Sequence, residues 1–116
     1  MSVSIFFLRG DFKIRVREWL RALRANGVRY RVTSTKRTWN EQARLYQRFL
    51  DGLSTLPAAP PGRSKHQLGL AIDVVFDVPG DLAIAVRSAG VHLLRWAGAG
   101  DRVHFDSPSE LPCPPC

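Results

Sequence analysis

Residues 64–73 have the sequence SKHQLGLAID, in which a histidine precedes a segment that alternates between apolar and other residues. Such alternation predicts a β-strand, and Asp73 lies within it, where an aspartate is disfavoured by propensity and costly to bury without a partner. Gly69 allows the chain to bend between His66 and this strand, while the small Ala71 leaves room beside Asp73 on the same strand face. The stretch therefore predicts two ionisable side chains close together in the chain, with space beside the carboxylate.

A second group of ionisable residues occurs in residues 101–106, which have the sequence DRVHFD. His104 is flanked by two apolar residues, so on a strand it projects to the face opposite both. Two imidazoles and one carboxylate from separate segments are the usual protein ligands of a catalytic zinc, with a fourth position left for water. His66, Asp73 and His104 are therefore candidate metal ligands, although a single buried histidine or aspartate is more often a hydrogen-bonded core residue. His92 stands alone at the end of a predicted helix, and we assign it no role.

Hydrophobic periodicity predicts the remaining elements, because apolar residues recur at helical spacing in three segments and alternate in others. The predicted order is helix, strand, helix, loop, strand, helix, strand, which favours a single small α+β domain with helices packed on an antiparallel sheet. The predicted helices cover residues 11–26, 38–50 and 81–90, the strands cover residues 28–33, 69–75 and 102–105, and the loop covers residues 53–62.

Two helix starts are predicted from capping residues. Asp11 is a plausible N-cap of the first helix, and Thr38 followed by Glu41 is a capping-box pattern at the start of the second. The second helix is expected to face inward with four residues at helical spacing, namely Trp39, Ala43, Tyr46 and Leu50.

Length and composition limit the classes of protein that this chain can belong to. With 116 residues, 45% of them hydrophobic and 23% charged, the chain is expected to form one compact domain with a real core. Lysine and arginine number 17 against 10 acidic residues, a formal net charge of +7, which favours a polyanionic partner. No apolar run approaches the about 20 residues of a membrane span, and the first ten residues lack the features of a signal peptide. We therefore expect synthesis in the cytoplasm.

The cysteines exclude a disulfide-framed fold, because Cys113 and Cys116 are the only two and both lie in the final LPCPPC. We assign residues 1–108 to the domain and residues 109–116 to a proline- and cysteine-rich tail. A solvated tail is the simpler interpretation, with a redox or metal role as the alternative.

The pattern Ser64-x-His66-x-x-Gly69-x-Ala71-x-Asp73, followed by His104-Phe105, closely resembles the signature of the zinc D-alanyl-D-alanine and L-alanyl-D-glutamate peptidases. These cell-wall peptidases share a fold with lysostaphin-type enzymes and with the signalling domain of hedgehog proteins. Upstream, TSTKRT at residues 33–38 and EQARLY at residues 41–46 are similar to the family's Ser-Gly-Tyr-Arg-Ser segment and its following helix. The resemblance covers roughly residues 28–106 and implies a hedgehog-like α+β fold.

The resemblance implies a role for several residues. It implies that the three candidate ligands bind one zinc ion per chain and that Asp101, three residues before His104, is the catalytic carboxylate that moves the proton. It further implies that Arg37 steadies the substrate or the developing oxyanion and that Ser64 lines the substrate site. Two departures occur: many members have glutamate where Asp101 stands, and Thr35-Lys36-Arg37 replaces the usual Gly-Tyr-Arg.

The function implied by this resemblance is zinc-dependent hydrolysis of the peptide stems of peptidoglycan. We predict an L-alanyl-D-glutamate endopeptidase of the endolysin type, a monomer that is attracted to the anionic cell envelope by its charge and acts on the cell wall after release from the cytoplasm. One alternative is D-alanyl-D-alanine carboxypeptidase chemistry on the same site. A non-catalytic, zinc-stabilised binding module is a second alternative, which Asp101 argues against. A basic nucleic-acid-binding domain would explain the charge but leaves both ionisable clusters without a role.

Overall fold

The computed structural model describes residues 3–108, and its four strands form one antiparallel sheet in the order β1-β2-β4-β3. Within that range, the elements follow the chain as α1 (Gly10–Ala25), β1 (Tyr30–Ser34), α2 (Trp39–Leu50), the 3-10 helix η1 (Lys65–Leu68), β2 (Ala71–Phe76), α3 (Asp81–Val91), β3 (Arg95–Trp96), the 3-10 helix η2 (Ala99–Asp101) and β4 (His104–Asp106). The predicted α+β domain with an antiparallel sheet is confirmed.

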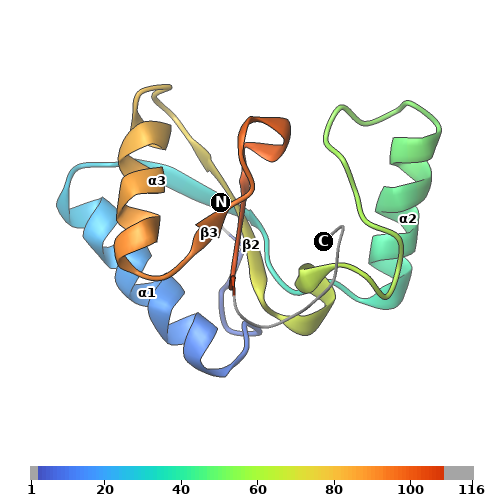
Figure 1. Ribbon diagram of the computed structural model, residues 1–116, viewed down its shortest axis with the longest axis horizontal. Helices are drawn as coiled ribbons and strands as arrows, with labels where there is room; N and C mark the ends of the chain where they lie inside the picture. Colours follow the sequence, from blue (N-terminus) through green and yellow to red (C-terminus); the bar gives the residue numbers. More distant parts are fainter. Residues whose placement is uncertain (1–2, 109–116) are drawn as a thin grey trace.

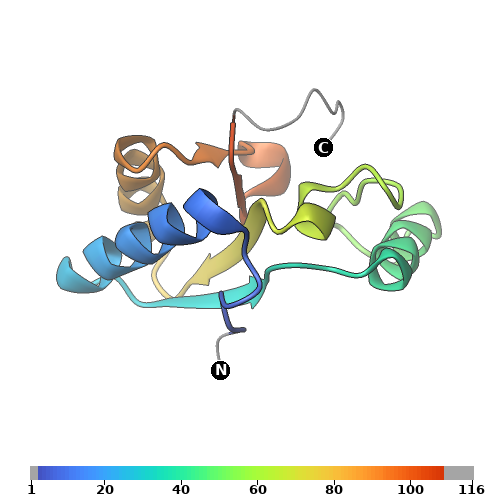
Figure 2. The same cartoon turned by 90° about the horizontal axis from the view of Figure 1, so that it is seen from below.

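The hydrophobic core lies between the sheet and two of the helices. The apolar stripe of α1 is buried as its spacing predicts, and Trp19 in this stripe packs against Phe105 of β4 with ring centroids 4.6 Å apart. Helix α3 contributes Ala85 and Ala89 to the same core. In Figure 1 α1 and α3 lie together at one end of the molecule, while α2 stands at the opposite end, and Figure 2 shows the same separation. One face of the sheet is thus covered by packed helices.

The predicted inward face of α2 differs from the one that the structure shows. Trp39 and Leu50 are 60% and 57% exposed, and the buried residue of α2 is Gln42. The hydrophobic core of residues 3–108 contains no side chain from this helix. A helical apolar stripe indicates one shielded face, but it does not distinguish a core from the side of a cavity.

The predicted capping box at the start of α2 is confirmed. The Thr38 hydroxyl accepts from the Glu41 N–H at 3.1 Å, and the Glu41 carboxylate accepts from the Thr38 N–H at 2.8 Å. The prediction for the first helix was wrong, because the N-cap is Arg9 and Asp11 lies inside the first turn. There the Asp11 carboxylate accepts from Arg15 Nε at 2.9 Å, one helical turn away, and is not a cap.

The end of the domain differs from the predicted strands in two details. Strand β3 was not predicted, because its two residues are too few to show alternation. Strand β4 begins at His104, two residues later than predicted. The predicted tail of residues 109–116, with Cys113 and Cys116, lies outside the described residues. No helix within residues 3–108 is long and apolar enough to cross a membrane.

We expect Trp19→Phe to lower the free energy of unfolding by about 2–3 kcal/mol. Trp19 is fully buried, and its indole N–H donates to the Ala85 carbonyl at 3.1 Å, so the smaller ring would leave a cavity and remove that hydrogen bond. Urea denaturation measures this loss. Arg17→Ala, on the exposed face of the same helix, is the control and should change little. A loss no larger than that of the control would contradict this account of the core.

Candidate active site

Sheet pairing brings two of the candidate ligands together. In the antiparallel register of β2 and β4, Asp73 stands directly opposite His104, and both side chains are largely buried. His66 reaches them from η1, whose N-cap is Ser64 and which ends at Gly69 in a left-handed conformation, φ +72°. A side chain at Gly69 would also meet the Phe7 carbonyl at 3.0 Å, so the bend that directs His66 toward β2 requires glycine.

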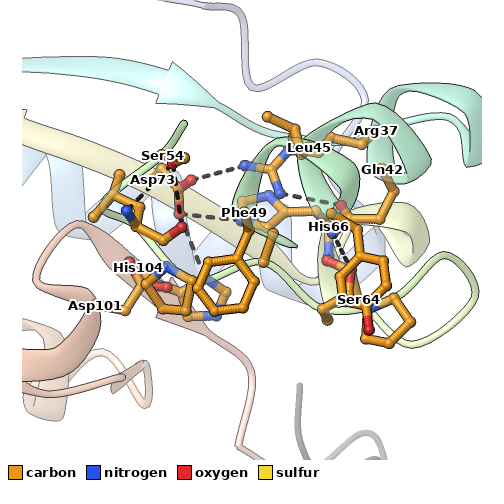
Figure 3. A pocket seen from close by; sticks show the side chains of 16 residues that line it. Arg37, Gln42, Leu45, Phe49, Ser54, Ser64, His66, Asp73, Asp101 and His104 are labelled. Atoms are coloured by element: carbon orange, nitrogen blue, oxygen red, sulfur yellow. Dashed lines mark hydrogen bonds and ion pairs between the residues drawn. The ribbon is translucent and has the colours of Figure 1, made fainter. Parts of the chain in front are cut away.

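The three side chains converge on one carboxylate oxygen. Asp73 Oδ1 lies 3.1 Å from His66 Nε2 and 3.4 Å from His104 Nδ1, and one potential ligand atom from each residue lies within 4.8 Å of the others. Figure 3 shows these side chains turned toward one another at the edge of a cavity. The second oxygen, Oδ2, accepts from Arg37 Nη2 at 2.9 Å. This arrangement leaves Oδ1 as the oxygen that faces both imidazoles.

Each imidazole is fixed by a hydrogen bond on its other nitrogen. His66 Nδ1 lies 2.7 Å from the Thr35 carbonyl oxygen, and His104 Nε2 lies 2.8 Å from Asp106 Oδ2. Both partners are acceptors, so these nitrogens carry the hydrogens, and Nε2 of His66 and Nδ1 of His104 are the atoms left to bind a metal. Histidine ligands of metals are held in this way almost without exception. The donor set and its surroundings therefore fit a zinc ion.

Electrostatics at the site prepares it for a cation. Burial would raise the pKa of Asp73, but hydrogen bonds from His104 and His66 outweigh it and hold the pKa well below its usual range. Burial would lower the pKa of His104, yet hydrogen bonds to Asp106 and Asp73 raise it to about 9. The Asp73 carboxyl therefore stays ionised at neutral pH. His104 is protonated there in the metal-free protein, so a metal ion that binds it must displace a proton.

Asp101 is placed by η2 in the same cavity as the three candidate ligands. Burial, together with the nearby Asp73 carboxylate, raises the pKa of Asp101 above its ordinary value, although His104 acts in the opposite direction. Within residues 3–108 its carboxyl makes no hydrogen bond or ion pair. The predicted catalytic carboxylate is thus at the cavity and free to exchange a proton.

Arg37 also reaches the cavity, as predicted. Besides its bond to Asp73, its guanidinium donates to Ser34 Oγ at 2.9 Å and to Gln42 Oε1 at 3.1 Å. Its backbone N–H donates to the His66 carbonyl at 2.9 Å, which fixes this segment to η1. Burial lowers the pKa of Arg37 from its ordinary value, against the opposite effect of the Asp73 carboxylate.

Ser64, predicted to line the substrate site, lines the cavity and is buried. Its hydroxyl oxygen accepts from the His66 N–H at 3.2 Å, so it also begins the helical turn that carries this ligand. His92 lies outside the cavity, where its Nδ1 is 2.9 Å from the Ser88 carbonyl oxygen at the end of α3.

The cavity has a volume of about 430 Å³ and two unlike sides. The sheet side carries the ionisable residues, and the other side is formed by α2 and residues 54–60, where Leu45, Tyr46 and Phe49 line the space. Gln42 joins the two sides, because its carbonyl oxygen accepts from Arg37 and its amide donates to the Ala59 carbonyl at 2.8 Å. Gln42 was not predicted to have a role; its signal in the sequence is a polar residue within the apolar face of a helix.

Comparison with known proteins adds a family match. The family model described as VanY, D-alanyl-D-alanine carboxypeptidase, matches residues 6–99. The match includes His66 and Asp73 and ends before Asp101 and His104, which the fold brings to the same cavity. Among curated proteins, none matches the sequence.

Three solved structures illustrate the likeness in fold. The LdcB LD-carboxypeptidase superposes with a TM-score of 0.71 at 17% identity over 92% of this chain, which spans 62% of that protein. The second structure is a mutant of the vancomycin-resistance D,D-pentapeptidase VanY from a VanB-type cassette, in complex with Zn(II). It superposes with a TM-score of 0.69 at 20% identity, and the match covers 86% of this chain and 72% of that one. The Serratia marcescens L-Ala D-Glu endopeptidase ChiX superposes with a TM-score of 0.60 at 23% identity. The match covers 89% of this chain and 82% of that one. The predicted peptidase-like fold is confirmed.

We expect zinc to bind at one ion per chain, and His66→Ala, Asp73→Ala and His104→Ala each to weaken binding severely, because three protein ligands leave none to spare. Metal analysis after gel filtration measures the zinc retained. His92→Ala should keep the full amount, because its ring lies outside the site. Stoichiometric zinc in the His66→Ala and His104→Ala proteins would refute the ligand assignment.

Zinc affinity should rise with pH, by about tenfold per unit from about pH 7 to about 8.5. In the metal-free protein the pKa of His104 is raised to about 9, so a proton competes with the metal below that pH and no longer competes above it. Competition titrations against a chelator at constant ionic strength measure the dependence. An affinity that does not change over this range would contradict competition between the metal ion and a proton on His104.

Proposed function

The chain belongs to the VanY family of D-alanyl-D-alanine carboxypeptidases, and we propose that it hydrolyses a peptide bond in the peptide stems of peptidoglycan with one bound zinc ion. The observation that carries this proposal is the convergence of the His66–Asp73–His104 cluster, Asp101 and Arg37 on one cavity. A zinc-stabilised module without turnover would need neither a free carboxylate nor an open cavity beside the ligands. A nucleic-acid-binding domain leaves the whole cluster without a role.

Each group has a place in the chemistry. When bound, zinc supplies Lewis-acid chemistry, which activates a water molecule near neutral pH and polarises the scissile carbonyl. Asp101 accepts the proton of the attacking water and delivers it to the leaving amine. A pKa raised by burial suits this double task, since a group that accepts and later donates works best near the operating pH.

Arg37 serves the reaction in two ways. It holds Asp73 through Oδ2, so the other oxygen remains directed at the imidazoles. Its positive charge, partly withdrawn from water, also offsets the negative charge that develops on the substrate oxygen. Substrate binding by Ser64 stays a prediction, which its place in the cavity supports because its hydroxyl hydrogen can still be donated.

For the bond that is cleaved, we propose the internal L-alanyl-D-glutamate bond of the stem. A carboxypeptidase must recognise the terminal carboxylate of its substrate, and Arg37 is the only lysine or arginine among the described residues that line the cavity. Three of its five N–H donors are already used, by Asp73, Gln42 and Ser34, so only part of its hydrogen-bonding capacity remains for a terminal carboxylate. Cleavage of the terminal D-alanyl-D-alanine bond is the second candidate, which the family match favours.

The positive charge of the surface supports an anionic partner. A second hollow of about 460 Å³ shares Arg37 with the cavity and is bordered by exposed basic side chains, Lys36, Arg44 and Arg48. Long-range attraction between such a surface and an anionic cell envelope would concentrate the protein near its substrate. Action on the cell wall after release from the cytoplasm, and action as a monomer, stay predictions.

Asp101→Asn should reduce the rate of stem cleavage by about 10²–10⁴, or about 3–5 kcal/mol of barrier, because the amide keeps the shape but cannot accept a proton. Zinc content and folding should be unchanged, since Asp101 is not among the ligands. Asp101→Glu should keep part of the rate. Asp77→Asn, in the exposed turn after β2, is the matched control and should be fully active. An Asp101→Asn protein that holds zinc and cleaves at the normal rate would rule out this mechanism.

Mass spectrometry of the products from purified peptidoglycan tests the proposed bond. We expect new N-terminal D-glutamate, released only by zinc-loaded protein and absent with His66→Ala. Free D-alanine as the sole product would instead establish the carboxypeptidase candidate. If the zinc-loaded protein releases neither product, the proposed function is wrong.

A further inference from the structure

Asp106 is a fully buried carboxylate surrounded by basic groups. It lies on β4 two residues after His104, with 0% of its surface exposed. Its Oδ1 accepts from Arg95 Nε at 2.9 Å and lies 3.6 Å from Lys65 Nζ, while its Oδ2 accepts from Arg95 Nη2 at 2.7 Å and lies 2.8 Å from His104 Nε2. Stability alone does not explain this cluster, because apolar residues of similar volume often stabilise a core equally well.

The contact between Asp106 and His104 orients the imidazole ring. The carboxylate accepts the Nε2 hydrogen, so the ring presents the lone pair of Nδ1 to Asp73 on the neighbouring strand. An imidazole free to rotate about its Cβ–Cγ bond would not hold that nitrogen in place. The bidentate bond from Arg95 fixes the carboxylate plane and, through it, the imidazole.

Lys65 extends the cluster to the second histidine segment. It is buried in η1 next to His66, and its ammonium donates to the Ser107 carbonyl just beyond β4 while facing Asp106. One carboxylate thus connects the segments that carry both histidines.

We propose that Asp106 is a positioning residue of the metal site, which orients His104 directly and holds the η1 segment in register through Lys65. The proposal rests on the zinc site of the proposed function, but it does not depend on which peptide bond is cleaved. Its signal in the sequence is the pair His-x-Asp in HFD, because residues two apart on a strand lie on the same face.

Zinc affinity of Asp106→Asn, measured by competition with a chromophoric chelator, tests the proposal. We expect a loss of about 10–100-fold, the usual effect of removing the partner of a metal-binding histidine. The cobalt(II)-loaded variant should also show an altered visible spectrum. Val16→Ala creates a cavity in the buried face of α1, so it controls for a general loss of stability. This variant should keep the parental zinc affinity and spectrum.

The possible outcomes separate this inference from the proposed function. A folded Asp106→Asn protein with parental affinity and spectrum would overturn the positioning role and leave the zinc site intact. Failure of the parental protein to bind zinc would overturn both.

A second measurement needs no variant. In the zinc-loaded parental protein, nitrogen-15 NMR of the histidine side chains should show His104 with a hydrogen on Nε2 that exchanges slowly with solvent. If Asp106→Asn fails to fold, this measurement decides the question. A His104 ring without a hydrogen on Nε2, or with one that exchanges freely, would contradict the proposal.

Discussion

The site depends on the two oxygens of the Asp73 carboxylate, which face different partners. Oδ1 meets both imidazoles, and Oδ2 accepts from the guanidinium of Arg37. Such a buried anion is tolerable only because cationic or hydrogen-bonding groups approach it from every open side. The pairing of β2 with β4, the turn at η1 and the segment after β1 each deliver one of those groups. The topology of this small domain can therefore be understood as the means by which three separate segments reach one carboxylate on β2.

Two of the candidate ligands could be predicted from the sequence because each breaks a local rule. Asp73 interrupts an apolar strand, and His104 lies between apolar neighbours, so neither has a structural explanation without a partner. The resemblance to a peptidase family then assigned roles to Asp101 and Arg37, and the structure places both at the cavity. Which residue caps a helix and where a two-residue strand lies could not be predicted, because those depend on contacts that alternation and spacing do not record.

Residues that act through others were harder to find. Gln42 has partners 5 and 17 residues away in the chain, Arg37 and Ala59. Besides His104, Asp106 has partners 11 and 41 residues away, Arg95 and Lys65, and only the fold brings these groups together. Helix α2 shows the same limit, because its apolar stripe has the spacing of a core helix but forms the side of a cavity. Periodicity reports that a face is sheltered, and the tertiary arrangement decides what shelters it.

The separation of α2 from the hydrophobic core has a consequence for how such a domain can change over time. Stability resides in α1, α3 and the sheet, whereas the residues that would touch a substrate beyond the metal come from α2 and residues 54–60. Substitutions, insertions or a complete exchange of that segment can therefore alter the shape offered to a ligand at small cost to folding, provided that the contacts of Gln42 are kept. A domain divided in this way can diversify its specificity while its catalytic chemistry stays constant.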